Sequence, residues 1–275
     1  MQIELIGPTS AGKSTLARGI LQAGREQGID TLMGDDFVLK QVRLNWVKRK
    51  LARTLCADLI SLFACLITLR NNLEFCHFAL RSIWQLPVGV ARIEKANIAR
   101  NVLKKIGIFE IVRRRSSDRQ IVVVDEGTLH TAHYLFVHVS VVPNTSELST
   151  FVRLVPKPDV VFHVQQDEDV LIERTLARGH KRIPDGSHAM VERFIRRAVD
   201  TFDDLVRQLA LGGAFVVVDG KQDLFVARDF ENDPLLAMAL KVIRAGRDAA
   251  LAEDLSMTMP RPRLQDACTA STILL

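Results

Sequence analysis

Short apolar runs alternate along the chain with longer stretches in which apolar residues recur every three or four positions. The short runs cover residues 2–6, 31–33, 121–124, 160–164 and 214–218. The run at 121–124 is continuously apolar, which is typical of a parallel strand that helices cover on both faces. We therefore expect an α/β fold, a three-layer doubly wound parallel sheet whose strands are joined by right-handed crossovers.

The longer stretches predict helices between these strands. In residues 14–27, Leu16, Ala17, Ile20 and Leu21 fall on one face of a helix. The same spacing predicts helices over residues 128–140, 146–154, 168–178, 187–211 and 233–249.

One segment departs from this alternation. From Leu44 to Leu73, leucines recur at three- and four-residue steps, which predicts helix. We expect a break around Pro87 and a second helix that stops at Gly107. The segment is too long for an ordinary crossover, so we interpret it as a helical insertion whose apolar residues, including Trp46 and Trp84, pack in its interior.

The expected domain organisation follows from these patterns. Residues 1–40 and 116–250 form the α/β core, residues 41–115 form the helical insertion, and residues 251–275 form a disordered tail without hydrophobic periodicity.

Composition narrows the classes of protein that the chain can belong to. It has 275 residues, a net charge of +5 and four cysteines without a C-x-x-C pair. The cysteines indicate buried thiols rather than a disulfide framework. The charge is too small to imply a nucleic-acid partner. The first residues lack a basic segment followed by a cleavage site, so we expect a cytoplasmic protein.

The most apolar stretch, residues 51–69, contains Arg53 and Asp58. It falls short of the uninterrupted apolar length that a membrane-spanning helix needs. We interpret it as a buried helix, and a contact with a membrane surface stays open. The sequence predicts no oligomeric state.

A phosphate-binding loop follows the first predicted strand. Residues 7–14 read G-P-T-S-A-G-K-S and match the pattern G-x-x-x-x-G-K-[ST] in full. Such glycines let successive backbone amides point at phosphate oxygens, and the next helix presents its positive N-terminus. We expect Lys13 to contact the β- and γ-phosphates of a nucleoside triphosphate and Ser14 to bind Mg²⁺. The nucleotide-binding residues predicted from the loop are Gly7, Thr9, Ser10, Ala11, Gly12, Lys13, Ser14 and Thr15.

Two carboxylates end the predicted strand at 121–124. Asp125 suits a second ligand of the nucleotide's Mg²⁺, usually through water, which would complete the site that Ser14 begins. Glu126 has three open interpretations: it can orient an attacking water in an ATPase, contact the acceptor in a kinase, or cap the turn at Gly127. No zinc-ligand spacing accompanies His133. It can face the nucleotide cleft, but we favour a place in the core or on the surface.

A third acidic element follows the second predicted strand, in the sequence G-D-D-F at residues 34–37. Ligand-binding residues of a doubly wound sheet lie at the carboxyl ends of its strands. A carboxylate there can accept the proton of an acceptor hydroxyl and align it with the γ-phosphate. Its charge suits a hydroxyl acceptor better than a phosphate, for which Lys40 or Arg43 would have to offset Asp35. A turn that caps the next helix is the alternative interpretation.

These motifs resemble the P-loop nucleoside and nucleotide kinase superfamily. Residues 35–37 are similar to the Asp-Asp-Phe element of the uridine kinase and nicotinamide riboside kinase group, which implies that Asp35 is the catalytic carboxylate. Residues 157–164, K-P-D-V-V-F-H-V, and the following helix resemble thymidylate kinase. The resemblance covers residues 1–40 and 120–245, and it implies a P-loop NTPase fold of the kinase type.

The thymidylate kinase resemblance also implies a lid whose arginines close over the phosphates. The residues that it assigns are Arg174, Arg178 and Arg182, with Arg178 and Arg182 acting in catalysis alongside Lys13. Arginine suits this role because its planar cation follows charge that spreads over the transferring phosphoryl group. The chain departs from thymidylate kinases where they carry Asp-Arg, since it has Asp125 and Glu126.

We therefore expect an enzyme that uses ATP and Mg²⁺ to phosphorylate a small-molecule acceptor, either a hydroxyl compound or a nucleoside monophosphate. The alternative is an ATPase that drives or switches a partner, with Glu126 orienting water. A third interpretation, a binding protein that uses the insertion on a partner or a membrane, rests on residues 51–69.

Overall fold

The computed structural model describes residues 1–87, 90–117, 120–138, 145–179, 183, 186–212, 216–219, 241 and 245. Within them, five parallel strands form one sheet in the order β2-β3-β1-β4-β5. The strands are β1 (Gln2–Ile6), β2 (Asp30–Met33), β3 (Gln120–Asp125), β4 (Val160–His163) and β5 (Val216–Asp219). This sheet confirms the expected α/β fold and each of the five predicted strands.

The central position of β1 follows from its pairing on both edges. Leu5 is in register with Asp125 of β3 on one side and with Phe162 of β4 on the other. Every residue of β1 is buried, as expected for a strand with neighbours on both edges and helices on both faces. The carboxyl ends of β1 and β3 therefore lie side by side, which brings the loop after Ile6 next to Asp125.

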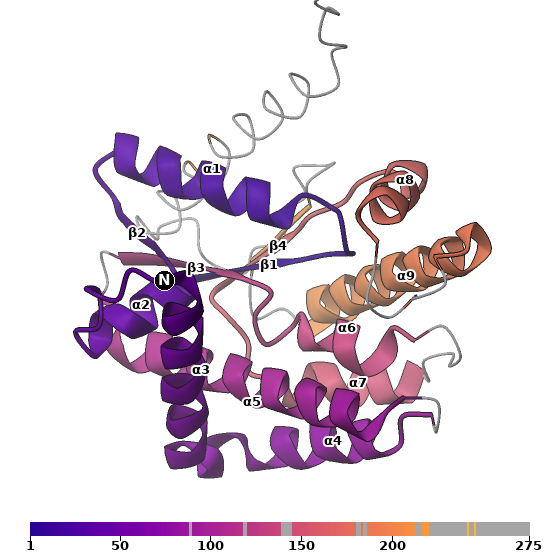
Figure 1. Cartoon of the computed structure of the whole chain (residues 1–275), viewed down its shortest axis with the longest axis horizontal. Helices are drawn as coiled ribbons and strands as arrows, with labels where there is room; N and C mark the ends of the chain where they lie inside the picture. Colours follow the sequence, from indigo (N-terminus) through magenta and orange to yellow (C-terminus); the bar gives the residue numbers. More distant parts are fainter. Residues whose placement is uncertain are drawn as a thin grey trace, which may run out of the picture.

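Helices cover both faces of the sheet (Figure 1). On one face, Ile3 and Leu5 pack with α1 (Lys13–Glu26), α8 (Glu168–Arg178) and the first half of α9 (His188–Gly212). On the other face lie α2 (Gly34–Gln41), α5 (Arg92–Arg115), α6 (Thr131–Phe136), α7 (Thr145–Leu154) and the second half of α9. The three layers of the prediction are present.

The insertion is helical, as expected, with boundaries that differ from the prediction. Helix α2 already begins at Gly34, and residues 42–49 are turns rather than helix. Then follow α3 (Lys50–Ile67), a 3₁₀ turn η1 (Leu69–Asn72), α4 (Leu73–Trp84) and α5. The break expected after Trp84 is present, since α5 begins only at Arg92.

The expectation that a helix stops at Gly107 is wrong, because α5 continues through this residue to Arg115. Gly107 instead lets α3 approach α5 closely. A Cβ atom there would lie 1.7 Å from the Ser61 carbonyl oxygen. The side of α3 that is buried consists of small or polar residues, namely Ala57, Asp58, Ser61 and Cys65. The glycine is thus a packing position, not a helix stop.

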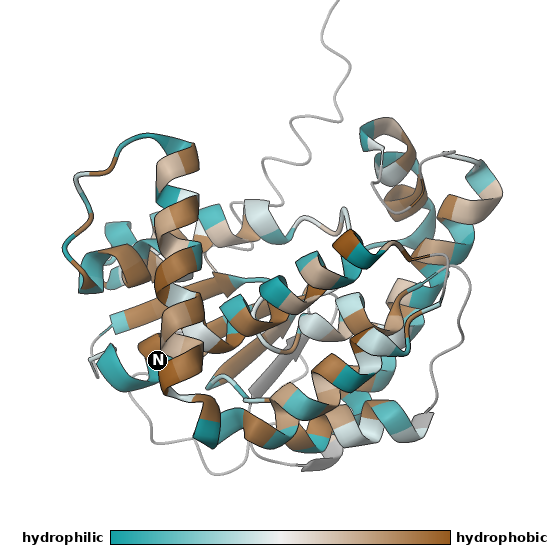
Figure 2. Ribbon diagram, turned by 60° about the horizontal axis from the view of Figure 1, so that its bottom comes forward, coloured by the Kyte–Doolittle hydropathy of each residue, from teal (hydrophilic) through white to brown (hydrophobic). Residues whose placement is uncertain are grey.

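The expectation that the leucines of residues 51–69 are buried is also wrong. Leu51, Leu55, Leu59 and Leu66 are between 61% and 81% exposed. Helix α3 packs mainly on α5 and α2, and Ile60 joins the cluster that includes Val122 and Val124 of the sheet. The opposite side of α3 has no neighbour in the described structure. Figure 2 shows α3 standing at the front of the molecule with hydrophobic residues along its length.

The two tryptophans are exposed, as the leucines are. Trp46 is 73% exposed and Trp84 is 85% exposed, so neither packs inside the insertion as the sequence suggested. Within the described residues, the large hydrophobic side chains that are more than 40% exposed all lie between Val42 and Ile93.

No single helix in the described part of the chain combines the length and apolar character that crossing a membrane requires. One pair, α3 with η1 and α4, reaches that length and composition only when joined across a bend of 80°. The helix predicted at 233–249 and the tail predicted at 251–275 lie outside the described residues, apart from single helical positions at Lys241 and Ala245.

Candidate nucleotide site

The loop between β1 and α1 has a backbone that requires glycine at two positions. Gly7 has a φ of +141°, and a Cβ atom there would lie 2.4 Å from the Val164 carbonyl oxygen. Gly12 has a φ of +94° and precedes the first residue of α1. No side chain caps this N-terminus. The amides of the first turn are therefore available to an anion, and the helix dipole favours one.

A pocket of about 950 Å³ opens in front of this loop. Its walls include nine of the residues that the sequence predicts for nucleotide binding: Thr9, Ser10, Ala11, Gly12, Lys13, Ser14, Thr15, Arg174 and Arg178. Gly7 lies below the pocket, where its carbonyl group contacts Lys13. Arg182 lies outside the described residues.

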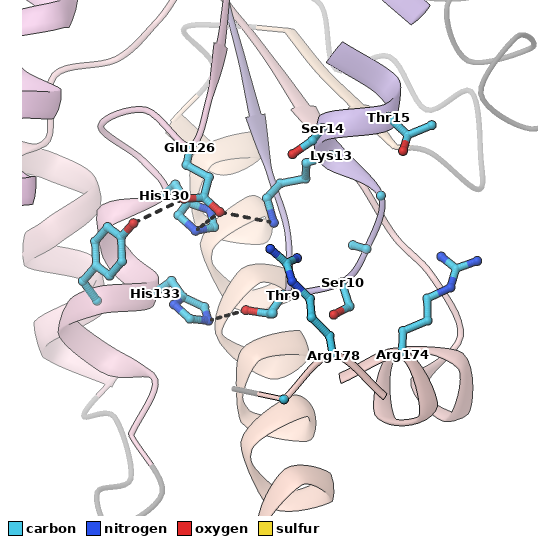
Figure 3. A pocket seen from close by; sticks show the side chains of 14 residues that line it. Thr9, Ser10, Lys13, Ser14, Thr15, Glu126, His130, His133, Arg174 and Arg178 are labelled. Atoms are coloured by element: carbon cyan, nitrogen blue, oxygen red, sulfur yellow. Dashed lines mark hydrogen bonds and ion pairs between the residues drawn. The ribbon is translucent and has the colours of Figure 1, made fainter. Parts of the chain in front are cut away.

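Two walls of the pocket carry opposite charge. Arg174 and Arg178 come from α8, whereas Glu126, His130 and His133 come from the segment after β3. Figure 3 shows Arg178 directing its guanidinium into the pocket toward Lys13, across from Glu126. An anion in the pocket would thus meet Lys13 from α1 and Arg178 from α8.

Lys13 is held at the base of the loop. Its ammonium donates hydrogen bonds to the carbonyl oxygens of Gly7, at 2.9 Å, and Pro8, at 2.8 Å. The Glu126 carboxylate lies 3.9 Å away. Burial lowers the pKa of Lys13, and the negative charges of Glu126 and Asp125 act in the opposite direction. These two carboxylates favour the charged lysine that a phosphate contact requires.

Ser14 and Asp125 meet although 111 positions separate them in the sequence. The Ser14 hydroxyl donates a hydrogen bond of 2.7 Å to Asp125 Oδ2. The other carboxylate oxygen, Oδ1, is buried and has no hydrogen-bond partner among the described residues. Burial raises the pKa of Asp125, which the bond from Ser14 partly offsets. A buried, unsatisfied carboxylate oxygen beside a hydroxyl fits a cation.

A magnesium ion on a triphosphate takes most of its ligands from phosphate and water, so one or two protein oxygens suffice. Within the part of the chain that the structure describes, no group of three or more His, Cys, Asp or Glu side chains is arranged to hold a metal. Ser14 and Asp125 are therefore the residues that fit such an ion.

Glu126 occupies a strained backbone conformation, with a φ of +65°. Its carboxylate accepts a hydrogen bond from the Tyr134 hydroxyl at 3.3 Å and lies 3.5 Å from His130 Nε2. Burial raises the pKa of Glu126, but Lys13 and Lys105 act against it, and the net pKa is lowered. Strain in a non-glycine residue at a pocket wall is typical of functional positions.

His133 is both a core residue and a pocket residue. It is 4% exposed, and its ring lies over His130 with the centroids 5.3 Å apart. Its Nε2 atom lies 3.5 Å from the Thr9 hydroxyl of the phosphate-binding loop (Figure 3). The sequence favoured a core or surface histidine and left a place at the cleft open, and the structure shows a core histidine that also reaches the cleft.

Asp35 does not line this pocket. It lies in the first turn of α2, half exposed, with its carboxylate 3.3 Å from the Lys104 ammonium of α5. Gly34 beside it is close to Val124, since a Cβ atom on the glycine would lie 3.2 Å from that side chain. Asp35 thus follows β2 at the same sheet edge as Asp125. The structure places the predicted base at the expected edge but pairs it with a lysine.

Three side chains of the site carry no sequence motif. Lys105 of α5 acts electrostatically on Lys13, Asp125 and Glu126. Tyr134 binds Glu126, as described above. Glu4 is fully buried beneath the turn at Gly127, and its carboxylate accepts a hydrogen bond of 2.9 Å from the His130 amide. Their roles depend on the packing of α5 and β1 against the segment after β3, which spacing along the chain does not reveal.

No protein-family model matches the chain, and no curated protein matches it. Among solved structures, it is similar to shikimate kinase from Acinetobacter baumannii in complex with shikimate. The identity is 12% and the TM-score is 0.35, with 94% of this chain and 95% of that chain covered. At this level the similarity adds no argument about this chain's substrate.

Proposed function

We propose that the protein is a phosphotransferase that uses ATP and Mg²⁺ to phosphorylate a small molecule, through a hydroxyl group. One observation carries the proposal: arginines of α8 face the phosphate-binding loop across a single pocket. Such cations can follow the charge that develops on a transferring phosphoryl group. A water-excluding closure of this wall would favour transfer over hydrolysis.

The residues of the loop fit the nucleotide part of this reaction. Loop amides and the N-terminus of α1 would hold the phosphates, and Lys13 would contact the β- and γ-phosphates. Ser14 and Asp125 would hold Mg²⁺, which neutralises charge on the phosphate oxygens when bound. Arg178 would contact the γ-phosphate from the opposite wall. Arg182, assigned by resemblance alone, remains part of the proposal.

Asp35 is proposed as the group that orients the acceptor and receives its proton. Its place after β2 puts it at the carboxyl edge of the sheet, where Asp125 also lies. Lys104 would hold the carboxylate in a fixed orientation, since it also bonds Asp58 at 2.7 Å. The transferring group would therefore lie between the loop and α2.

A phosphate acceptor, such as a nucleoside monophosphate, is less well supported. It would need a cation to offset Asp35, and the sequence offered Lys40 or Arg43 for this role. The Lys40 ammonium instead lies 3.3 Å from Asp30. Lys104 is the cation that lies beside Asp35, but it is shared with Asp58 at 2.7 Å and so offsets Asp35 only in part. The remaining negative charge favours an uncharged hydroxyl acceptor.

ATP hydrolysis is the second candidate, and one observation favours it. Glu126 lines the pocket and lies 3.9 Å from Lys13, whereas Asp35 lies outside the lining. A carboxylate in that position can orient a water molecule toward the γ-phosphate. ATP would then be hydrolysed to ADP and phosphate without any acceptor.

The two candidates differ in whether ADP release depends on an acceptor. ATP turnover is measured with Mg²⁺ in buffer alone and then with pools of nucleosides, nucleotides, sugars and small alcohols. We expect turnover to rise with at least one pool and the product to contain the γ-phosphate. Equal turnover with and without every pool would contradict the phosphotransferase and favour hydrolysis.

A further inference from the structure

Helix α3 is built with its small residues inward and its large hydrophobic residues outward. Ala57, Ser61 and Cys65 are buried against the neighbouring helices. Six large side chains on the opposite side are 61–81% exposed: Leu51, Leu55, Leu59, Phe63, Leu66 and Ile67. We call these six residues the α3 face. A contiguous apolar surface of this kind indicates a contact with another apolar phase.

The positive charge of the chain is concentrated around the same surface. Residues 41–93 contain eight Lys and Arg against two Asp and Glu, whereas the remaining residues contain 29 against 30. Lys48, Arg49 and Lys50 form an exposed run at the start of α3, and Arg70 is exposed just after its end. The acidic residue within α3, Asp58, is buried and bonded to Lys104.

A groove of about 330 Å³ continues the α3 face toward α2 and the end of α5. Phe63 and Ile67 belong to both, and Val38 and Ile111 add apolar wall. Arg114 and Arg115 lie at this groove, and both are exposed. The groove also contains Glu110, which is buried and paired with Arg114 at 3.2 Å, so Arg115 is the cation left over among the described residues of the groove. The groove therefore offers apolar walls together with a cation, which suits an acyl chain with an anionic headgroup.

We propose that the α3 face docks on the surface of an anionic lipid bilayer. A helix with a leucine-rich side and flanking lysines and arginines lies in the plane of the headgroups and inserts its apolar side chains. Trp46, four residues before α3, is 73% exposed, and tryptophan favours the membrane interface. Because Asp58 and Ser61 hold α3 on α5, the helix meets the bilayer along its side and does not cross it.

Charge favours a bilayer over a second copy of the chain. In a two-fold symmetric contact, each partner presents the same surface to the other. The basic run at residues 48–50 and Arg70 of one copy would then face basic residues of the other, which is unfavourable. An anionic bilayer has the opposite charge and an apolar interior.

Docking is tested by co-sedimentation of the full chain with phosphatidylcholine vesicles, with and without phosphatidylserine. We expect binding to the anionic vesicles that falls with added salt. Leu55→Gln/Leu59→Gln should weaken it about tenfold or more, because two exposed leucines no longer enter the apolar phase. MgATP binding is the folding control for this variant, since neither residue lines the nucleotide pocket.

A charge variant separates electrostatic attraction from apolar insertion. Lys48→Ala/Arg49→Ala/Lys50→Ala should weaken binding to anionic vesicles about a hundredfold, given the attraction of each cation to such a surface. The matched control, Arg25→Ala/Arg153→Ala/Arg193→Ala, removes the same charge at exposed positions elsewhere and should change binding little. An equal loss in both variants would overturn the proposal.

Fluorescence reports whether the surface itself meets the lipid. The chain has two tryptophans, so a Trp84→Phe variant reports Trp46 alone. Its emission should shift to shorter wavelength with anionic vesicles. The proposal is overturned if the wild type does not sediment with these vesicles. It is likewise overturned if sedimentation velocity shows a dimer that Leu55→Gln/Leu59→Gln dissociates, since a second copy would then cover the α3 face.

Discussion

The Ser14 hydroxyl bonds Asp125 Oδ2 at 2.7 Å and thereby joins the first turn of α1 to the end of β3. The contact depends on the parallel pairing of β1 with β3, in which Leu5 is in register with Asp125. It also leaves Asp125 Oδ1 buried without a partner among the described residues. The pair is thus arranged around a position that a cation can fill.

Asp125→Asn should weaken the Mg²⁺ dependence of ATP binding. The amide keeps the shape of the side chain but lacks the charge that holds the ion, so we expect a loss of about 10- to 100-fold in Mg²⁺-assisted affinity. Calorimetric titration of ATP with and without Mg²⁺ measures this difference. Asp200→Asn, an exposed change on α9, is the control. An unchanged Mg²⁺ dependence in Asp125→Asn would mean that the pair is structural.

Glu126→Gln separates the two candidate reactions. If the protein is a phosphotransferase, the variant should lose less than about tenfold in transfer, because Glu126 then does not move the reacting proton. The variant should also bind ATP more tightly, because the negative charge of Glu126 beside Lys13 repels the phosphates and glutamine lacks it. If Glu126 orients water, acceptor-independent turnover should fall by about 10² or more. Single-turnover assays with and without an acceptor distinguish these results.

Asp35→Asn should lower transfer about 10²-fold or more while ATP affinity stays nearly unchanged. The neighbouring carboxylate supplies a matched control, because Asp36 pairs with Arg53 of α3 rather than with Lys104. Asp36→Asn should leave transfer close to that of the wild type. Equal activity of the wild type and Asp35→Asn would mean that Asp35 has only a structural role in the first turn of α2.

The sheet and the loop could be predicted because local sequence determines them. Short, mainly apolar runs identified all five strands, and the glycines of residues 7–14 have a backbone requirement that the structure shows at Gly7 and Gly12. The position of Asp125 at the end of a strand followed from the same pattern, whereas the pairing of that strand with β1 is known from the structure alone. These features depend on neighbours in sequence and on the rules of parallel sheets.

The environment of the insertion could not be predicted in this way. Helical spacing shows that Leu55 and Leu59 share a side of α3, but not whether that side meets protein. The tertiary fold places Ser61 and Gly107 between the helices and leaves the leucines outside. Likewise, Lys105 and Lys104 come to the site and to Asp35 only because α5 packs where it does.

Gly107→Ala tests the close contact between α3 and α5. At a solvent-exposed helical position this change would stabilise the protein by about 1 kcal/mol. Here the new Cβ would lie 1.7 Å from the Ser61 carbonyl oxygen, so α3 must shift, and we expect a loss of about 1–3 kcal/mol. Urea unfolding measures the sign, and Ala96→Gly on the exposed side of α5 calibrates helix propensity. A stabilised Gly107→Ala protein would contradict the packing.

Glu4 of β1 carries a fully buried carboxyl group next to Gly127. Burial raises its pKa to about 7, and the bond from the His130 amide reduces the shift. The Thr128 hydroxyl lies 2.7 Å from the Pro156 carbonyl oxygen and 3.2 Å from Glu4. Its single proton can serve only one of them, so a protonated Glu4 can donate to Thr128.

The sign of the pH effect follows from this raised pKa. Below pH 4.5 Glu4 is protonated in both folded and unfolded chains. As the pH rises to 7, the unfolded chain loses the proton first, so the stability that Glu4 contributes falls, by about 3 kcal/mol. Glu4→Gln cannot ionise, and its amide can still donate to Thr128. Relative to the wild type, its free energy of unfolding should therefore increase between pH 4.5 and 7. Urea titrations of both proteins across this range measure the difference, and parallel curves would show that burial does not raise the pKa of Glu4 in the folded protein.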